Sequence, residues 1–239
     1  MSNKRVPVLL YHSIVNKNSQ HELNVDSFED QISYLKKIGY KSIHFNEIKP
    51  EIKNQIILTF DDGYKDNILN ALPILIKYGF KATCFIVSNH IGKYNIWDIN
   101  KKNYERKELM NNYDINEWLS HGMLIGSHTH NHLDLTKYDV KEIKNEINFS
   151  KNFLENTFSQ QVNDFCYPFG KVNTKVFTEV KRTYKNAVTT KRSRYNLLKH
   201  NNFLIPRVDM GKNLNKIKIL LKLKTIYEDI KYNEIRLHM

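Results

Sequence analysis

QIILTFDDG, residues 55–63, joins a short and largely apolar run to two adjacent carboxylates. A short apolar run rich in isoleucine predicts a strand that is buried on both faces, as is typical of parallel sheets. Two carboxylates at the end of such a strand repel each other unless a cation or a proton relieves the repulsion. We therefore expect a strand over 55–60, followed by one metal ligand and one proton acceptor at Asp61 and Asp62. The alternative is a plain turn, because Asp-Gly is a common turn dipeptide.

Outward from this stretch, β-rich runs and amphipathic runs alternate along the whole chain. Further strands are predicted over 6–11, 41–45, 82–87, 123–127, 164–167, 186–190 and 203–208. Helices are predicted between them, over 26–38, 65–78, 105–121, 138–157, 173–184 and 213–231. This alternation of about eight strands predicts an α/β fold, namely a single (β/α) barrel of seven to eight strands, complete or distorted. An open doubly wound sheet is the alternative, and either fold gathers functional residues beyond the C-terminal ends of its strands.

The composition is that of one globular domain. The chain has 239 residues, of which 41% are hydrophobic and 26% charged, and fits a single domain over 1–239 with a basic helical segment at 212–239. Its formal charge of +12 indicates either an anionic partner or a basic solvated surface. No nucleic-acid-binding motif accompanies the charge, so nucleic acid is not an expected partner. Cys84 and Cys166 are far apart in the sequence and indicate neither a zinc ribbon nor a disulfide scaffold.

The start of the chain carries no recognisable targeting signal. Its apolar run, residues 6–10, is shorter than the core of a signal peptide. No stretch of about 18 apolar residues predicts a transmembrane helix. We therefore expect a cytoplasmic protein without a transmembrane segment, or an exported one if the native chain starts elsewhere, and its basic charge still allows peripheral contact with a membrane.

A second polar cluster, GSHTHNH at 126–132, follows the strand predicted over 123–127. His128 and His132 are four residues apart, so a helical arc after the strand would bring both imidazoles to one face, within reach of one ion. Together with Asp62 they would form a site of two histidines and one carboxylate, which suits zinc or another divalent first-row ion and leaves positions for water and substrate. The alternative is an exposed loop that carries three histidines without a metal.

These two clusters resemble the signature motifs of the polysaccharide deacetylases, carbohydrate esterase family four. TFDDG at 59–63 resembles the family's T-F-D-D-G motif, and HTHNH at 128–132 resembles its H-[S/T]-x-x-H motif. The resemblance extends from about Val6 to Asp209. It implies Asp61 as the catalytic base and Asp62, His128 and His132 as ligands of a divalent metal. Zn²⁺ is the first expectation for that metal, with Ni²⁺, Co²⁺ and Fe²⁺ as alternatives.

A third motif departs from the family's pattern. CYPFG at 166–170 resembles R-x-P-[Y/F]-G, but Cys166 stands where the family has an arginine that orients the catalytic aspartate. The resemblance implies that the backbone N–H of Phe169 helps to hold the oxyanion. We expect Arg207, at the end of the last predicted strand, to replace the missing arginine. A surface arginine is the alternative.

The family's L-x-H motif, whose histidine is the general acid, has its match at the start of the chain, as Leu10-Tyr11-His12. A closed barrel permits this position, because its first and last strands are neighbours. The arrangement resembles the permuted branch of the family, which includes poly-N-acetylglucosamine deacetylases. It implies His12 as the general acid, and we expect Asp209 to orient it.

The resemblance implies a hydrolase that removes N-acetyl groups from a sugar or glycan, in bacterial polysaccharide or glycan biosynthesis or modification. Its partner would be an N-acetylated saccharide, which a lipid or a nucleotide could carry. Two alternatives stay open. A metal-dependent amidase or esterase for another acyl group would share every motif, and a non-catalytic carbohydrate-binding relative would share the fold. Residues 88–105 are weakly patterned and fit either a loop over the site or a surface excursion.

Overall fold

The computed structural model describes residues 5–16, 22–100, 102, 104–212 and 214–231. Its strands are β1 (Arg5–Val6), β2 (Val8–Tyr11), β3 (Ile14–Val15), β4 (Leu23–Asn24), β5 (Lys41–Ser42), β6 (Gln55–Phe60), β7 (Thr83–Ile86), β8 (Leu124–Ser127), β9 (Asp164–Cys166), β10 (Asn186–Arg192), β11 (Tyr195–Asn196) and β12 (Ile205–Asp209). Its α-helices are α1 (Val25–Lys37), α2 (Leu72–Tyr78), α3 (Asn112–Ser120), α4 (Val140–Phe158), α5 (Thr174–Thr183), α6 (Lys216–Lys224) and α7 (Tyr227–Lys231).

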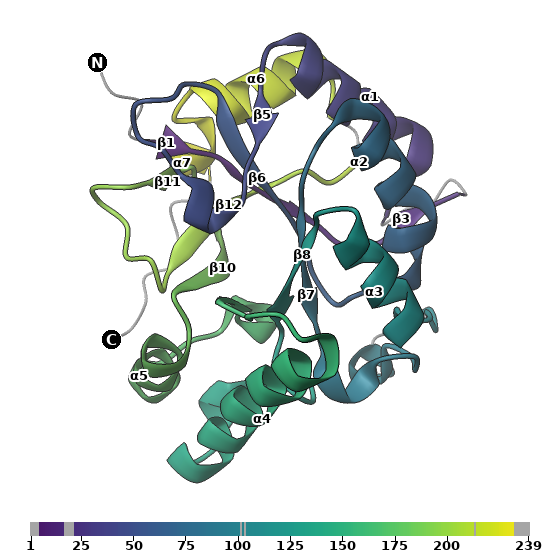
Figure 1. Ribbon diagram of the computed structural model, residues 1–239. Coiled ribbons are helices and arrows are strands. Elements are labelled where there is room, and N and C mark those ends of the chain that lie inside the picture. The colour runs from purple at the N-terminus through teal and green to yellow at the C-terminus, as the bar shows by residue number, and fades with distance from the viewer. Residues whose placement is uncertain (1–4, 17–21, 101, 103, 213, 232–239) are drawn as a thin grey trace.

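Seven parallel strands of the described residues close into a barrel, and the helices lie around it (Figure 1). The order around the ring is β2, β12, β10, β9, β8, β7 and β6, and β2 pairs with β6 to complete it. The short strand β5 pairs with the first two residues of β6. The closed ring confirms the predicted single (β/α) barrel, with seven strands, and excludes the open doubly wound sheet.

Alternate residues of the barrel strands belong to two separate cores. In β6, the outer core beneath the helices contains Ile56, Leu58 and Phe60, whereas Ile57 belongs to an inner cluster. Strands β2, β7, β9, β10 and β12 contribute to the same inner cluster, through Val8, Phe85, Cys166, Val188 and Ile205. Side chains of a strand alternate between its two faces with a period of two. His12, Asp61 and Arg207 are each an even number of residues after an inner residue of the same strand, Val8, Ile57 or Ile205. The alternation therefore directs all three into the barrel.

Some predicted elements have different bounds. The strand predicted over 6–11 is interrupted at Pro7, which has no N–H to donate. The helix predicted over 105–121 is wrong in its first part, because α3 begins at Asn112 with Asn111 as its N-cap. Before that cap, Glu108 and Leu109 form bridges with Tyr94 and Tyr64 instead. The strand predicted over 41–45 is reduced to the two residues of β5.

The basic segment predicted over 212–239 is described as far as residue 231. It forms two helices, α6 and α7, where one helix over 213–231 was predicted; residues 213 and 232–239 lie outside the described residues. Among the helices that the structure describes, none is both long enough and apolar enough to cross a bilayer. A cytoplasmic location stays a prediction.

Candidate active site

Strand β6 ends in the barrel mouth with two buried carboxylates, Asp61 and Asp62. Neighbouring residues of a strand normally point to opposite faces. Here the strand has ended, and Asp62 has a φ of +74°, in the left-handed region. Such a φ is uncommon for a residue other than glycine and is typical of a conformation that the surroundings enforce. The turn brings Asp62 beside two histidines while Asp61 keeps its inward position.

Arg207 on β12 binds the carboxylate of Asp61 from inside the barrel. Its Nη1 donates to Oδ1 at 2.7 Å, and its Nη2 donates to Oδ2 at 2.6 Å. The guanidinium is 1% exposed and also donates to Thr59 Oγ1 and to the carbonyl of Thr189. Burial alone would raise the pKa of Asp61, but the charge and hydrogen bonds of Arg207 outweigh it, so the pKa is lowered. Asp61 is therefore ionised at neutral pH.

Cys166 lies beside this pair rather than replacing it. Its thiol Sγ is 3.4 Å from Asp61 Oδ2 and 3.4 Å from Arg207 Nη2. Burial, and then the neighbouring Asp61, raises the pKa of the thiol. Cys166 therefore stays a neutral thiol in this position.

Asp62, His128 and His132 bring three buried metal-ligand atoms within 4.8 Å of one another. The Nε2 atoms lie 3.4 Å (His128) and 3.3 Å (His132) from Asp62 Oδ1. His128 Nδ1 is 2.8 Å from the carbonyl oxygen of Cys166. A carbonyl can only accept, so Nδ1 carries the proton and the Nε2 lone pair of the neutral ring faces Asp62. Acceptors that converge on one point need a cation or a proton between them, so this donor set fits a divalent metal.

Protons compete with a metal for the same group of atoms. Burial would lower the pKa of His128, but its hydrogen bond with Asp62 and the charge of Asp61 raise that pKa well above its usual value. Burial would raise the pKa of Asp62, but its hydrogen bonds with His128 and His132 hold it well below the usual range. A cation at this site must therefore displace a proton, and its affinity should fall as the pH falls.

The loop that carries the two histidines is not the helical arc that their spacing predicted. Residues 128–134 have no helical assignment, and Thr129 and His132 have left-handed φ values of +65° and +57°. The hydroxyl of Thr129 accepts a hydrogen bond from the N–H of His132 at 2.9 Å. The helical arc considered for this loop is therefore absent, although the two imidazoles do meet at Asp62. The left-handed conformations of Thr129 and His132 bring the two imidazoles together instead.

Helix α4 holds this loop from behind through two residues that the sequence reasoning missed. Glu146 is buried and accepts hydrogen bonds from the N–H groups of His130 at 3.1 Å and Asn131 at 2.9 Å. One turn further along the helix, Ser150 donates to the carbonyl of Thr129 at 3.1 Å. The sequence did contain a sign of this role for Glu146, which falls on the apolar stripe of α4. A charged residue at such a position is rarely buried without a partner.

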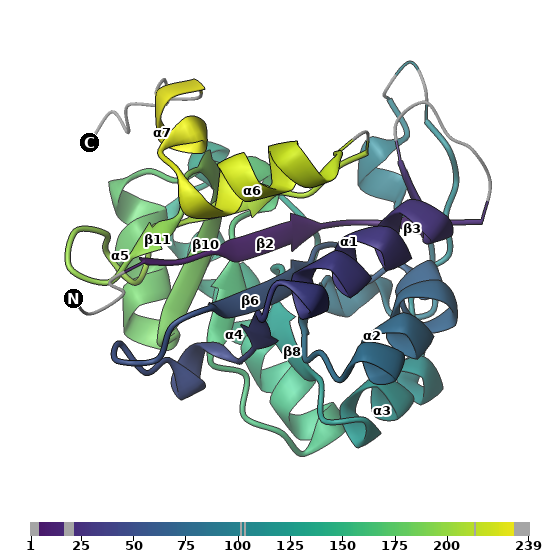
Figure 2. The ribbon, with the colours of Figure 1, turned by 90° about the horizontal axis from the view of Figure 1, so that it is seen from above.

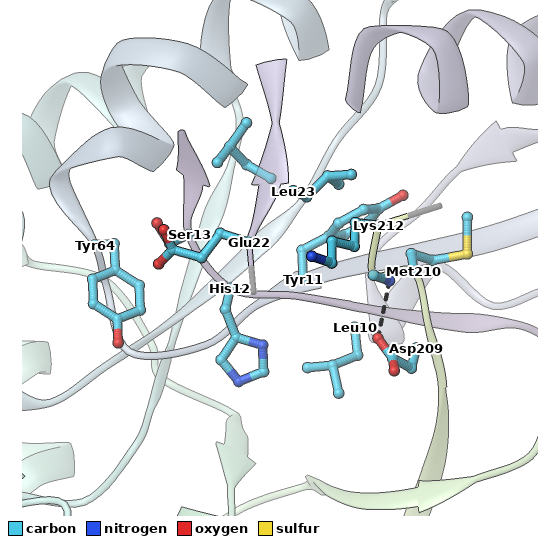
Figure 3. A pocket seen from close by; sticks show the side chains of 12 residues that line it. Leu10, Tyr11, His12, Ser13, Glu22, Leu23, Tyr64, Asp209, Met210 and Lys212 are labelled. Atoms are coloured by element: carbon cyan, nitrogen blue, oxygen red, sulfur yellow. Dashed lines mark hydrogen bonds between the residues drawn. The ribbon is translucent and has the colours of Figure 1, made fainter. Parts of the chain in front are cut away.

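His12 extends β2 into the mouth, as the alternation predicts. Its Nε2 lies 3.9 Å from Asp61 Oδ2, and its side chain is 52% exposed. His12 lines a pocket of about 410 Å³, together with Tyr64, Asp209 and Lys212 (Figure 3). Asp209 does not have the contact expected of it. Its carboxylate accepts hydrogen bonds from Arg192 at 2.6 Å and from the N–H of Gly211 at 3.0 Å, and the described residues record none with His12.

Two aromatic side chains flank His132. Phe169 lies in the tight turn Pro168–Gly170 with a φ of +59°, and its ring is 4.8 Å from the imidazole of His132. A Cβ on Gly170 would lie 1.9 Å from Thr190 Oγ1, so this turn requires glycine. Trp97 also contacts His132, with the two rings stacked at 4.4 Å. Trp97 comes from the weakly patterned segment 88–105, which therefore lies partly over the site.

A family model of polysaccharide deacetylases matches residues 49–188, which are more than half of the chain. The chain belongs to the polysaccharide deacetylase family. The matched region contains both motifs on which the resemblance rests, TFDDG and HTHNH.

Two relatives illustrate how this chain compares with other members of the polysaccharide deacetylase family. The Bacillus subtilis (strain 168) protein YxkH, whose name assigns it to these deacetylases, is 32% identical over 194 residues, or 78% of this chain and 64% of that protein. A Staphylococcus aureus (strain MRSA252) poly-beta-1,6-N-acetyl-D-glucosamine N-deacetylase is 27% identical over 167 residues, or 64% of this chain and 55% of that protein. The chain thus matches between 55% and 64% of the length of these two relatives.

Solved structures show the same barrel. BC0361, a polysaccharide deacetylase from Bacillus cereus, is 27% identical, with a TM-score of 0.79 over 92% of this chain and 69% of that chain. Streptococcus pyogenes deacetylase PplD has a TM-score of 0.81 over 92% of this chain and 98% of that chain, with 24% identity. The likeness to PplD is one of fold.

Proposed function

We propose that this protein is a metal-dependent hydrolase that removes the N-acetyl group from an N-acetylated saccharide, in the biosynthesis or modification of a bacterial polysaccharide or glycan. The observation that carries the proposal is the position of Asp61, ionised and held by Arg207, directly beside the converging atoms of Asp62, His128 and His132. This arrangement offers a proton acceptor next to a place for a Lewis acid. The family membership and the relative named as an N-deacetylase support an acetamide as the substrate.

Each residue then has one role in the hydrolysis. When bound, a divalent cation polarises the acetamide carbonyl and acidifies water. Asp61 accepts the proton of the attacking water, and Arg207 keeps that carboxylate ionised and oriented. The backbone N–H of Phe169 donates to the oxygen that becomes negative. His12 donates a proton to the nitrogen as the C–N bond breaks, because an amide nitrogen leaves poorly as an anion. The products are acetate and a free amino sugar.

We propose Zn²⁺ as the cation, with Ni²⁺, Co²⁺ and Fe²⁺ as alternatives, because two imidazole nitrogens and one carboxylate oxygen suit all of these ions. Asp209 has no part in this scheme as the partner of His12. Its bonds to Arg192 and Gly211 indicate that it orders the start of the chain beyond β12. The saccharide could be attached to a lipid or a nucleotide, since the chemistry at the acetamide does not depend on that attachment.

The proposal is tested by measuring acetate released from N-acetylglucosamine oligomers by protein loaded with each metal in turn, with chelator-treated protein as the blank. The Asp61→Asn protein should keep its metal and lose turnover, because an amide cannot accept the proton. The His132→Ala protein should lose metal and turnover together, since each of the three ligands supplies one bond to the ion. Stoichiometric metal in purified His132→Ala protein would remove His132 from the ligand set.

Two other functions give different results in the same assay. A metal-dependent amidase or esterase for another acyl group would leave N-acetylglucosamine oligomers intact but hydrolyse simple aryl acetates or other amides in a metal-dependent way. A non-catalytic carbohydrate-binding relative would bind the oligomers and release no acetate from any substrate.

A further inference from the structure

The outward face of α6 and α7 carries large apolar side chains where a surface helix normally carries polar ones. Ile217 is 69% exposed and Leu221, one turn further along α6, is 37% exposed. Ile226, just before α7, is 51% exposed, and Ile230, one turn further along, is 67% exposed. These four residues form what we call the C-terminal apolar face.

The core does not require these four side chains, because the opposite side of α6 already anchors the helix. Ile219 and Leu223 are buried and belong to the outer core. Lys222 is also buried, donates to the carbonyl of Asp209 at 2.9 Å and pairs with Glu228. α6 lies along the outside of the barrel beyond β2, and α7 follows at its end (Figure 2). The exposed apolar side chains of the two helices are therefore outside the core.

Three lysines lie on α6 beside its part of the C-terminal apolar face. Lys216, Lys218 and Lys224 on α6 are exposed. Lys216 Nζ lies 5.9 Å from the ring of Tyr34, and the described residues record no ion pair for any of these three lysines. The sequence from 210 to 230 contains five lysines and two acidic residues, Glu228 and Asp229. Glu228 pairs with Lys222 and Asp229 with Arg5, so neither acid is paired with the three exposed lysines. An apolar ridge bordered by unneutralised ammonium groups is the pattern of a helix that lies in the interface of an anionic membrane.

We propose that the C-terminal apolar face docks on an anionic lipid surface, with the four apolar side chains at the level of the acyl chains and the lysines among the headgroups. The positive charge favours an anionic lipid surface over a second copy of this chain as the partner of this face. A second copy of this chain would bring the same lysines and a net charge of +12 to the contact, and like charges oppose such a pairing. If α6 docks along its length, the side of the barrel that α6 covers faces the membrane. The loop after β12, which lines the pocket of His12, then lies near the lipid surface.

The test is co-sedimentation of the full chain with vesicles of phosphatidylcholine alone and with vesicles that contain one quarter phosphatidylglycerol. We expect binding to the anionic vesicles only, weakening as salt is added. Replacing Ile217 and Ile230 by Ser should reduce the vesicle partition coefficient about tenfold, because apolar burial and headgroup attraction act together. The matched control replaces two apolar residues of similar exposure elsewhere, Leu198 and Leu69, and should bind like the unaltered protein.

A second pair of variants separates local charge from net charge. Lys218→Glu with Lys224→Glu should weaken binding strongly, whereas Lys175→Glu with Lys181→Glu on α5 makes the same change in net charge and should weaken it little. Equal losses in the two pairs, or equal binding to both kinds of vesicle, would overturn the proposal. So would self-association on a sizing column that the Ile217→Ser variant abolishes, because the face would then be a contact between copies. Far-ultraviolet circular dichroism checks that each variant is folded, and none of these measurements depends on deacetylation.

Discussion

Arg207 and Asp61 form a two-point contact across the inside of the barrel, with Nη1 2.7 Å from Oδ1 and Nη2 2.6 Å from Oδ2. Their strands, β12 and β6, are not neighbours, because β2 lies between them in the ring. Cys166, the residue at the motif position where the family has an arginine, touches both partners from β9. The guanidinium thus reaches the aspartate from a different strand, and a thiol fills the space left at the motif position.

Removing the guanidinium should affect both stability and the pH profile. Arg207→Met leaves a buried carboxylate without its partner, which typically costs about 3–5 kcal/mol. Without Arg207 the burial of Asp61 dominates, so its pKa rises and the acidic limb of the kcat/KM profile moves to higher pH. Urea denaturation and pH–rate profiles measure the two effects, with Arg207→Lys as the variant that keeps the charge. An acidic limb that does not move in Arg207→Met would mean that Asp61 is not the titrating base.

His12 should affect turnover rather than metal binding, since its Nε2 lies beside Asp61 and not among the three converging ligand atoms. We expect His12→Ala to keep its metal and to lose roughly 10²- to 10⁴-fold in kcat on an acetamide, the usual contribution of a positioned acid. The loss should be much smaller on an aryl acetate, whose phenolate leaves without a proton. Equal losses on the two substrates would argue against a role as general acid.

Glu146 should control metal affinity through the loop it holds, without touching the metal. Glu146→Ala frees two backbone N–H groups of that loop, and we expect the metal dissociation constant to rise about 10- to 100-fold, as is common for residues that orient ligands. At saturating metal, kcat should stay close to that of the unaltered protein. Asn145→Ala on the exposed side of α4 is the control for helix propensity. Unchanged metal affinity in Glu146→Ala, measured by competition with a chelating dye, would leave Glu146 with a purely structural role.

A buried carboxyl outside the site should make stability fall as the pH rises. Burial raises the pKa of Asp164 to about 6, against the hydrogen bond from Asn186. The folded state then binds a proton more tightly than the unfolded state. The free energy of unfolding should therefore decrease between about pH 4 and pH 6, by on the order of 2–3 kcal/mol. Asp164→Asn should flatten this decline, whereas Asp30→Asn at the surface should not. Urea denaturation of chelator-treated protein across this pH range measures the decline in the free energy of unfolding. An equal decline in Asp164→Asn would show that Asp164 is not its cause.

The strand pattern and the catalytic motifs could be read from the sequence because they depend on short-range rules. The run 55–60 appears as β6 with its predicted bounds, and the period of two along β2, β6 and β12 accounts for the convergence of His12, Asp61 and Arg207. The alternation of strands and helices predicted a parallel sheet but left both the closed barrel and the open sheet possible, and the pairing of β2 with β6 decides for the barrel. Local signals were therefore enough for the strands, although not for the closure of the ring.

The remaining features depend on contacts that sequence spacing does not encode. The four-residue separation of His128 and His132 suggested a helix, whereas Glu146 and Ser150 of a later helix hold the loop in left-handed turns. Likewise, the amphipathic pattern that predicted a helix from residue 105 is overridden until Asn112 by bridges to Tyr94 and Tyr64. In both places tertiary hydrogen bonds outweigh local preference.

The pairing of β2 with β12 joins Leu9 to Val208 and closes the ring between segments far apart in the chain. During synthesis on the ribosome, β2 can pair with β6 early, but its other edge has no partner until β12 has emerged. His12 can approach Asp61 as soon as β2 and β6 have paired, whereas Arg207 on β12 meets Asp61 only after that last pairing. A nascent chain therefore carries an open sheet edge for most of its translation, which exposes it to faulty pairing with other chains. The same delay means that the carboxylate of Asp61 lacks its guanidinium partner until the barrel is complete.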